Sequence, residues 1–316
     1  MSQVSPQGGS SAEFVPKARI AHEGPARSAM LADRGAVLVT GMDAKRLLQG
    51  IITNDLDVLE AGELAMLAGL LSPQGKILFE FLVSRRADGF VLEVAREQSA
   101  ALAKRLALYK LRASVDIADA GDSLVVFAAW GGAPVPANSN AYLDPREPAL
   151  GMRGTMAAGG LAVGMTWSAS AADYHAHRIA LGIPEGGKDY DFGDAFPHEA
   201  NFDLDHGVSF EKGCYVGQEV VARMQHKTVV RKRVVRVSAA RELPPGRPDV
   251  KAGEIVIGRL GSVAGTRGLA MLRLDRVLEF QVNGIPVHAD GITLSVDAHA
   301  LESYRRSATA QGAKPA

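Results

Sequence analysis

Residues 212–219 read Lys-Gly-Cys-Tyr-Val-Gly-Gln-Glu and contain Cys214, the one cysteine in 316 residues. A single thiol cannot form an intrachain disulfide, and it cannot hold zinc or an iron–sulfur cluster without ligands from elsewhere. Lys212 precedes the thiol by two residues, and a run with helical spacing, Val216–Met224, follows it. A helix N-terminus and a nearby ammonium both favour the thiolate, so this octet predicts a reactive thiol. The alternative is a small apolar residue packed in a loop.

Two polar stretches in the first third of the chain offer further candidates. Asn54 and Asp55 follow a short apolar segment; such pairs usually form turns and less often face a ligand. Glu80 lies between Leu78 and Leu82 on one face of a predicted strand. We expect its carboxylate either at the solvated margin of the sheet or, as the minority interpretation, facing a ligand.

A long polar connection, residues 183–207, supplies the last candidate. Ordered loops of this length are uncommon inside domains and are often functional. Glu199 follows Pro197, which limits the backbone, and a carboxylate held on a stiffened loop suits recognition of a heterocycle edge. An ordinary surface glutamate is the competing interpretation.

Composition excludes several classes of function. The chain is 47% hydrophobic and 22% charged, with 35 basic and 35 acidic side chains. This is an ordinary globular composition without long-range attraction to nucleic acid or to an anionic membrane, although a local patch remains possible. No apolar run approaches the ~18 residues of a membrane span, so we expect no membrane partner. The balanced charge likewise predicts no direct DNA contact.

The cysteine count and the N-terminus predict a cytoplasmic protein. One cysteine fits a reducing compartment, and residues 1–28, a polar tail, lack the pattern of a secretory signal. A transit peptide is a weaker alternative, because Lys17, Arg19 and Arg27 are basic. His175 and His177 are two apart and point to different sides of a helix, and no paired-cysteine spacing occurs, so a metal site is not expected.

The elements that would position these residues change in character along the chain. The first half predicts a compact α+β unit, with a strand at 36–39, a helix capped by Asp43, a hairpin at 64–83, a strand at 90–94, an amphipathic helix at 99–109, and strands at 112–117 and 123–129. A strand at 161–167 and a helix capped by Ser170 and ended by Gly182 follow.

The pattern from Val229 onward indicates a small β-barrel or sandwich. Short strands near 229–238, 254–260, 268–276, 285–288 and 292–297 are separated by glycine-rich turns. We place this domain at residues 229–300 and a polar tail at 301–316. The basic stretch 226–236 is interpreted as a strand with charged edges, or else as a contact for an anion such as a phosphate or a polyglutamate tail.

The order of several motifs resembles the YgfZ family of folate-binding proteins, relatives of the T-protein (aminomethyltransferase) of the glycine cleavage system. The match runs from about residue 30 to about residue 300. Its motifs are Gly41–Ala44 with Leu48–Asp55, Ser72–Leu78, Tyr109–Arg112, Arg178–Pro184, Pro197–Asn201 and the octet.

The resemblance implies a tripartite, ring-like α+β fold, with two α/β parts in residues 29–228 and a C-terminal β-barrel. It also implies tetrahydrofolate bound in a central cleft. By motif, Lys212, Cys214, Tyr215, Gln218 and Glu219 belong to the family signature and Arg223 follows it, while Asn54, Asp55 and Glu199 would be cleft residues, with Glu80 beside them. The resemblance thus implies Cys214 and Lys212 as candidate catalytic residues and eight candidate folate-binding residues: Asn54, Asp55, Glu80, Glu199, Tyr215, Gln218, Glu219 and Arg223.

The resemblance further implies a role as a folate-dependent accessory protein in assembly or repair of iron–sulfur clusters. Partners would be the assembly machinery and client enzymes, including ones that modify tRNA. The T-protein carries an aspartate pair where this chain has Phe79-Glu80, which argues against true aminomethyl transfer and leaves its status as an enzyme open. A folate-dependent one-carbon transferase using Glu80 or Asp55 is the alternative, and an RNA- or protein-binding module at 226–236 is a third.

Overall fold

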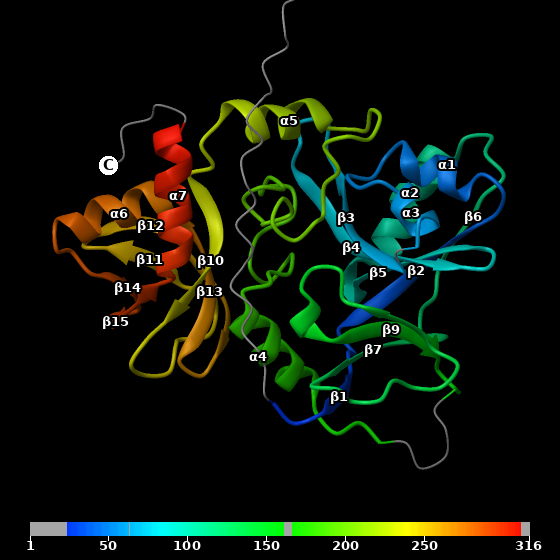
Figure 1. The fold of residues 1–316 in the computed structure, drawn as a ribbon, viewed down its shortest axis with the longest axis horizontal. Helices are drawn as coiled ribbons and strands as arrows, with labels where there is room; N and C mark the ends of the chain where they lie inside the picture. The colour runs from blue at the N-terminus through cyan, green and yellow to red at the C-terminus, as the bar shows by residue number, and fades with distance from the viewer. Residues whose placement is uncertain (1–23, 63, 161–165, 311–316) are drawn as a thin grey trace, which may run out of the picture.

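The computed structural model describes residues 24–62, 64–160 and 166–310, and these form three sheets with helices packed around them (Figure 1). Figure 1 shows the seven-stranded sheet on one side and the other two sheets on the opposite side, with the connection after α4 between them. The tripartite α+β architecture expected from the resemblance is therefore confirmed.

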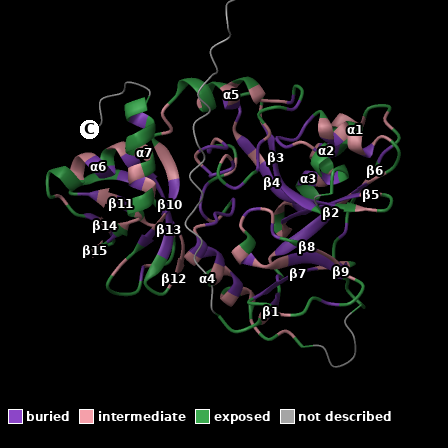
Figure 2. Ribbon diagram, in the orientation of Figure 1, coloured by how far each residue is buried: buried purple, intermediate pink, exposed green. Residues whose placement is uncertain are grey.

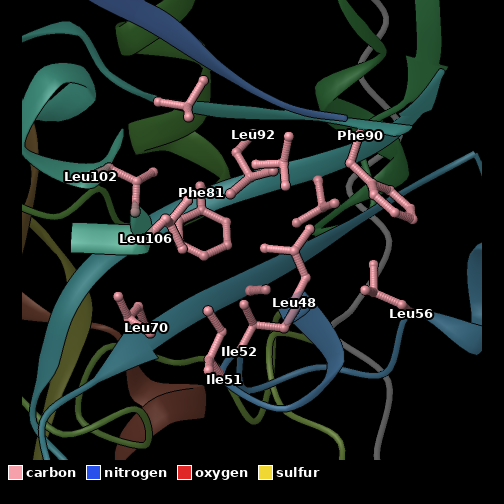
Figure 3. Packing of buried hydrophobic residues seen from close by; sticks show 14 of the residues in the cluster. Leu48, Ile51, Ile52, Leu56, Leu70, Phe81, Phe90, Leu92, Leu102 and Leu106 are labelled. Atoms are coloured by element: carbon pink, nitrogen blue, oxygen red, sulfur yellow. The ribbon is translucent and has the colours of Figure 1, made fainter. Parts of the chain in front are cut away.

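The first α/β part is a five-stranded antiparallel sheet in the order β3-β4-β5-β2-β6. Its core packs the helices against one face of the sheet through leucines, isoleucines and phenylalanines, including Leu48, Phe81 and Leu106 (Figure 3). The elements are β2 (Arg34–Thr40), α1 (Ala44–Gln49), α2 (Asp57–Glu60), β3 (Ala65–Leu71), β4 (Ile77–Arg86), β5 (Gly89–Ala95), the 3₁₀ turn η1 (Arg96–Gln98), α3 (Ser99–Lys110) and β6 (Asp116–Asp119).

The predicted hairpin at 64–83 is confirmed as β3 and β4. The Ser72 N–H donates to the Lys76 carbonyl at 2.8 Å, and Gly75 takes the left-handed φ of 79° that such a turn requires. Both strands are buried on both faces (Figure 2), because helices cover one side and the 183–207 connection covers the other. The strand expected at 112–117 begins later, at Asp116.

The second α/β part is a four-stranded antiparallel sheet in the order β1-β7-β9-β8 with helix α4 against it. Ser170 caps α4 as predicted, through a reciprocal capping box with Asp173, and Gly182 ends the helix in the left-handed conformation. The elements are β1 (Arg27–Met30), β7 (Leu124–Trp130), β8 (Asn140–Leu143), the 3₁₀ turn η2 (Pro148–Leu150), β9 (Met152–Ala157) and α4 (Ala171–Leu181).

Three expectations for the α/β parts are corrected or lie outside the described residues. Strand β1 starts at Arg27, inside the stretch predicted as a tail, and pairs with β7. The strand predicted at 161–167 lies mostly outside the described residues. Asp43 precedes α1 as expected, but its carboxylate accepts from the Ser114 N–H at 2.8 Å and does not cap the helix.

The C-terminal part is a seven-stranded sheet in the order β15-β14-β11-β12-β13-β10-β16, with helices α6 and α7 against it. A ten-residue helix, α5 (Gln218–Lys227), leads into it. The elements are β10 (Lys232–Ser238), β11 (Asp249–Ala252), β12 (Ile255–Ala264), β13 (Arg267–Arg273), α6 (Leu274–Val282), β14 (Val287–Ala289), β15 (Ile292–Thr293), β16 (Ser295–Val296) and α7 (Ala298–Ala310).

The polar tail predicted at 301–316 is wrong over residues 301–310, which belong to α7. Leu301 and Ala308 are the buried residues of this helix, two turns apart, while most of the rest is polar. Two apolar contacts make too thin a stripe to reveal a packed helix in the sequence. The sequence analysis also missed helix α6. Among the described helices, none is long and apolar enough to cross a membrane.

Candidate functional site

Lys212 anchors the octet to the end of α1. Its side chain is buried, and the ammonium donates to the carbonyls of Gln49 at 2.7 Å, Ile52 at 2.9 Å and Asn54 at 2.8 Å. Burial lowers the pKa of Lys212 to about 8, against the attraction of Asp55 and Asp57. Three acceptors use all three N–H donors. The Lys212 ammonium therefore positions the loop through backbone carbonyls, and its effect on the thiol stays a prediction.

Asn54 and Asp55 complete this anchor and do not face a ligand cleft. The Asn54 amide donates at 2.7 Å to both the Leu67 and the His206 carbonyl, and its oxygen accepts from the Asp55 N–H. Burial raises the pKa of Asp55, but hydrogen bonds from the Asp57 N–H and the Gln49 amide outweigh it, and the pKa lies below its usual value. The turn-forming interpretation of the pair is correct.

Two close backbone approaches fix the octet on the β3–β4 hairpin. Gly217 has φ 84°, and a Cβ atom there would lie 2.8 Å from the Ser72 carbonyl oxygen. A Cβ atom on Gly75 would lie 2.9 Å from Val220 in α5. Both positions thus require glycine, both for conformation and for space. The hairpin turn and the start of α5 are held together as one surface.

Cys214 is exposed on this surface and lines a pocket of about 570 Å³, which we call the octet pocket. Helix α5 begins at Gln218, two residues later than the predicted run, so Cys214 lies four residues before the helix and not at its N-terminus as expected. The pocket lies between the hairpin turn and α5, and its lining is Pro73, Cys214, Tyr215, Val216, Gly217, Gln218, Glu219 and Ala222.

The other signature residues have different roles around the octet pocket. The Tyr215 hydroxyl is buried with no hydrogen-bond partner among the described residues, and burial raises its pKa. The Gln218 amide donates to the Lys212 carbonyl at 3.3 Å. Glu219 and Arg223 form an exposed ion pair at 2.7 Å one helical turn apart. Tyr215 is therefore the signature side chain with an unmet hydrogen bond.

Glu80 lies away from the octet pocket. It is buried, and its carboxylate accepts from the Tyr190 hydroxyl and, at 3.1 Å, from the Gly186 N–H. Burial raises the pKa of Glu80. The solvated position that the strand alternation predicted is wrong, because the 183–207 connection covers this face of β4.

Glu199 closes a local turn. One carboxylate oxygen accepts from the Phe196 N–H at 2.9 Å, and the Glu199 carbonyl accepts from the Val234 N–H at 2.9 Å. The residue is partly exposed, and its second carboxylate oxygen accepts no hydrogen bond from the described residues. The eight residues expected to line one folate cleft thus divide among the anchor, the octet pocket, the Glu80 environment and this turn.

The basic stretch at 226–236 is largely neutralised. Arg233 forms a two-pronged pair with Asp203 at 2.8 and 2.9 Å, and Arg236 pairs with Asp297. Strand β10 lies between β13 and β16. The structural interpretation of these charges is favoured over the anion contact.

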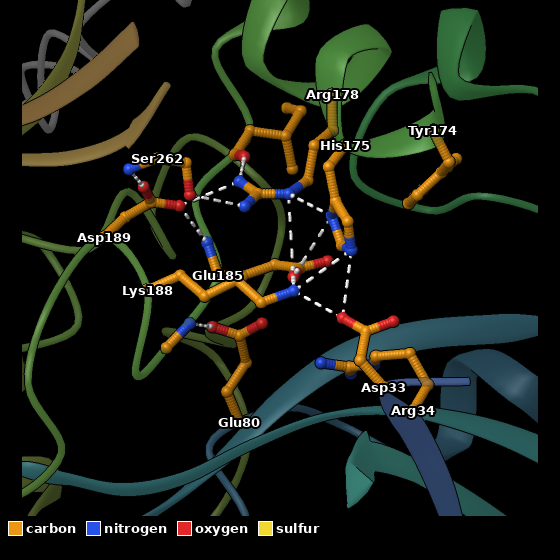
Figure 4. Close-up of polar contacts among 12 residues, drawn as sticks. Asp33, Arg34, Glu80, Tyr174, His175, Arg178, Glu185, Lys188, Asp189 and Ser262 are labelled. Carbon is orange, nitrogen blue, oxygen red and sulfur yellow. Dashed lines mark hydrogen bonds and ion pairs between the residues drawn. The ribbon is translucent and has the colours of Figure 1, made fainter. Parts of the chain in front are cut away.

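A set of charged residues, which sequence analysis missed, joins all three parts of the molecule (Figure 4): Arg178, Glu185 and Asp189 are buried, and Asp33 and Lys188 are partly exposed. Arg178 of α4 donates to Asp189 at 2.8 Å and to Ser262 of β12 at 2.7 Å, and lies 3.6 Å from Glu185. Lys188 pairs with Glu185 at 3.0 Å and with Asp33 beside β2. We call this set, with His175, the charged junction.

Charge balance explains the junction. Burial raises the pKa of Glu185, but the Arg178 charge outweighs it and the pKa lies well below its usual value. The Arg178 Nε–H donates to His175 Nδ1 at 3.1 Å, while His177 faces elsewhere, with its Nε2 2.8 Å from the Ala149 carbonyl. The divergence of the two histidines is as predicted. Nothing in their spacing could have revealed partners so distant in sequence.

The junction also contains the described residues that could hold a metal ion. Ligand atoms of Asp33, His175 and Glu185 all lie within 4.8 Å of one another. The Lys188 ammonium lies among them, 3.0 Å from Glu185 and 3.1 Å from His175 Nε2. A cation of the protein's own thus already balances this carboxylate pair, and we interpret the set as structural.

Comparison with known proteins now places the chain. Residues 231–300 match the family described as CAF17, C-terminal beta-barrel domain. The human iron-sulfur cluster assembly factor IBA57, mitochondrial, is 32% identical over 77% of this chain and 76% of its own length. The chain belongs to the IBA57 family. The IBA57 homologue from Mycosarcoma maydis is 36% identical over 65% of this chain. The match covers only 55% of the length of that relative.

Membership of the IBA57 family corrects two expectations. The relatives are named as mitochondrial, which contradicts the predicted cytoplasmic location. The family shown is that of IBA57, and the bacterial YgfZ type is not specifically shown.

The fold relationship to the T-protein is confirmed. The glycine cleavage system aminomethyltransferase T from Bartonella henselae matches with a TM-score of 0.66 at 15% identity, over 87% of this chain and 86% of that one. At this identity the likeness concerns the fold alone.

Proposed function

We propose that this protein is an accessory factor for iron–sulfur cluster assembly that presents Cys214 to a cluster or ligand held by a partner. One observation carries the proposal: the sole cysteine is exposed on a loop that Lys212 and two glycines hold rigidly. The relatives' names as assembly factors support it.

The arrangement limits what the thiol does. One thiolate supplies one of the four cysteine ligands that a cluster usually takes, so the partner provides the others. The cluster is then cargo shared for a time between two proteins. The thiol lies at the rim of the octet pocket, where a partner can reach it. The clients we propose are iron–sulfur enzymes, including ones that modify tRNA.

Tetrahydrofolate is the small molecule we propose for this protein, and its fit is partial. Asn54 and Glu80 have their polar atoms occupied by the protein itself, so they do not fit a folate site. The octet pocket is within the ~300–1,000 Å³ of typical small-molecule sites, at about 570 Å³. Gln218 and Glu219 line it with polar side chains, and these two residues would recognise the polar edge of a pterin.

The Glu80 environment does not support one-carbon transfer. A group that takes or gives a proton must reach the reacting atom. The Glu80 carboxylate is instead enclosed by Tyr190 and Gly186, and Asp55 accepts from Gln49 and Asp57. Neither of the acid–base groups expected for the transferase alternative, Glu80 and Asp55, lies in a suitable place.

Two experiments separate the parts of the proposal. Cells that carry Cys214→Ala as their only copy should show lowered activity of iron–sulfur enzymes at unchanged levels of the variant protein, and normal activity would contradict the role of the thiol. Isothermal titration of the purified protein with tetrahydrofolate should give a measurable heat that Gln218→Ala reduces. No heat would contradict folate binding and leave the thiol proposal standing.

A further inference from the structure

The C-terminal end of α3 presents an apolar surface to solvent. Leu108 is 65% exposed and Leu111 is 89% exposed, and Met42, ahead of α1, is 91% exposed. The two segments lie side by side, because the Asp43 N–H donates to the Ser114 carbonyl at 3.2 Å and the Ser114 N–H donates back to the Asp43 carboxylate at 2.8 Å. Three large aliphatic side chains thus share one part of the surface.

Leu111 is held out at a cost to the backbone. It follows the last residue of α3 with φ 44° and ψ −107°, a conformation that favours glycine. Its exposed side chain recovers no packing energy in return, whereas Leu102 and Leu106 on the other face of α3 are fully buried. Backbone strain of this kind clusters at functional sites.

The segment that carries Leu108 and Leu111 also carries cations without an acidic partner. Residues 99–114 contain no acidic residue. Lys104, Arg105 and Arg112 have no acidic partner among the described residues. Lys104 and Leu108 are four residues apart on α3 and so lie on the same face of the helix. Arg112 follows Leu108 by another four residues, just beyond the end of the helix. Cations and aliphatic groups thus lie next to one another. We call this surface the α3 tip: Met42, Lys104, Arg105, Leu108, Leu111 and Arg112.

We propose that the α3 tip docks the protein on an anionic lipid surface. Aliphatic side chains enter the boundary between headgroups and acyl chains, and lysine and arginine beside them meet the lipid phosphates. The charge complementarity is local, which is compatible with a chain of zero formal net charge. Docking is peripheral, since the described helices include none that could cross a membrane.

The surface fits lipid better than a protein partner. The α3 tip is the end of a helix. None of its residues lines the octet pocket, where we propose that a protein partner meets Cys214. Protein–protein hot spots are enriched in tryptophan, tyrosine and arginine, and leucine is under-represented there. The most exposed side chains of the α3 tip are leucine and methionine. Figure 1 shows α1 and α3 on the side of the molecule away from the barrel, so docking leaves the barrel free.

Co-sedimentation of the full chain with lipid vesicles tests the proposal. We expect binding to vesicles of equal parts phosphatidylcholine and phosphatidylglycerol, weak binding to phosphatidylcholine alone, and a loss of binding as salt rises. Removing the charges with Lys104→Gln, Arg105→Gln and Arg112→Gln should weaken binding about a hundredfold, at roughly fivefold per cation. The matched control is Arg241→Gln, Lys251→Gln and Arg267→Gln on the barrel, which should bind like the wild type.

Two apolar variants separate binding from folding. Leu108→Ser with Leu111→Ser should weaken binding to the anionic vesicles at least tenfold. Leu111→Gly accepts the φ of 44° without strain, so it should unfold at a temperature no lower than the wild type and still bind more weakly.

Three results would overturn the proposal. The first is no binding of the wild type to anionic vesicles at low salt. The second is equal binding by the double serine variant. The third is binding to soluble polyglutamate that is as tight as binding to vesicles and competes with it, because this would assign the α3 tip to an acidic protein partner.

Discussion

The octet and the charged junction both bury a cation among oxygen atoms, but the oxygens differ. Lys212 of the octet meets three neutral carbonyls from one short segment. Arg178 and Lys188 of the junction meet carboxylates, and Arg178 also bonds a barrel residue. The first arrangement fixes one loop and leaves Cys214 in solvent. The second joins separate parts and buries the charges of Arg178, Glu185 and Asp189.

This difference predicts which changes have global effects. The junction connects β2, α4, the 183–207 connection and β12, so breaking it should lower the stability of the whole molecule (Figure 4). The octet is held from one side, so breaking its anchor should chiefly release a loop. The comparison can be tested by substitutions ordered from the largest expected effect to the smallest.

Arg178→Met should have the largest effect on stability. It leaves Glu185 and Asp189 buried without their main countercharge, and removing one partner of a buried pair typically costs about 3–5 kcal/mol. The free energy of unfolding in urea measures it. Arg223→Met, which breaks the exposed pair with Glu219, is the control and should change stability little. Equal effects of the two substitutions would remove the distinction between junction and surface.

Lys212→Met should have a smaller and more local effect. Three carbonyls lose their hydrogen-bond donor, which should lower the free energy of unfolding by about 2–3 kcal/mol in total. The loss is limited because water can reach part of the segment. Amide hydrogen exchange should rise in residues 49–55 and 212–217 and remain unchanged in the barrel. Exchange that rises everywhere would show that the anchor supports the whole fold.

The same lysine predicts a pH dependence. Its pKa is about 8 when folded and near 10.5 when unfolded, so between these values the unfolded chain binds more protons. The free energy of unfolding should therefore rise with pH across this window in the wild type relative to Lys212→Met. Parallel profiles for the two proteins would place the ammonium in a solvated environment and contradict the anchor.

Tyr215→Phe should have the smallest effect on stability. It removes a buried hydroxyl that has no partner among the described residues, so the thermal midpoint should stay the same or rise slightly. Tetrahydrofolate binding by titration calorimetry should stay the same, because the buried hydroxyl is not exposed to a ligand in the octet pocket. A clear loss of stability would show that the hydroxyl already has a partner, such as a buried water.

Local signals in the sequence predicted local structure well. The capping box at Ser170, the hairpin turn at Gly75 and the glycine-punctuated barrel strands all depend on neighbours in sequence. The resemblance of motif order added the tripartite arrangement, which composition and periodicity alone did not provide. Helix α7 was missed because its apolar stripe is thin, and helix α6 was missed because its first turn lies inside the strand expected at 268–276.

Side-chain partners far apart in sequence could not be predicted. Lys212 was expected at the thiol because it is two residues away, but its acceptors come from residues 49–54. Glu80 was expected at a sheet margin because strand alternation says nothing about which loop covers a face. Arg178 lies 84 residues from its partner Ser262 in sequence. Such pairings depend on the packed fold.

The central claim is that Cys214 meets a cluster held by a partner, and alkylation of the thiol tests it most directly. The purified protein is treated with iodoacetamide alone, with an iron–sulfur assembly partner that carries its cluster, and with the same partner without a cluster. We predict that the cluster-loaded partner slows alkylation of Cys214 markedly and that the empty partner does so less. Equal rates in all three mixtures would contradict the account.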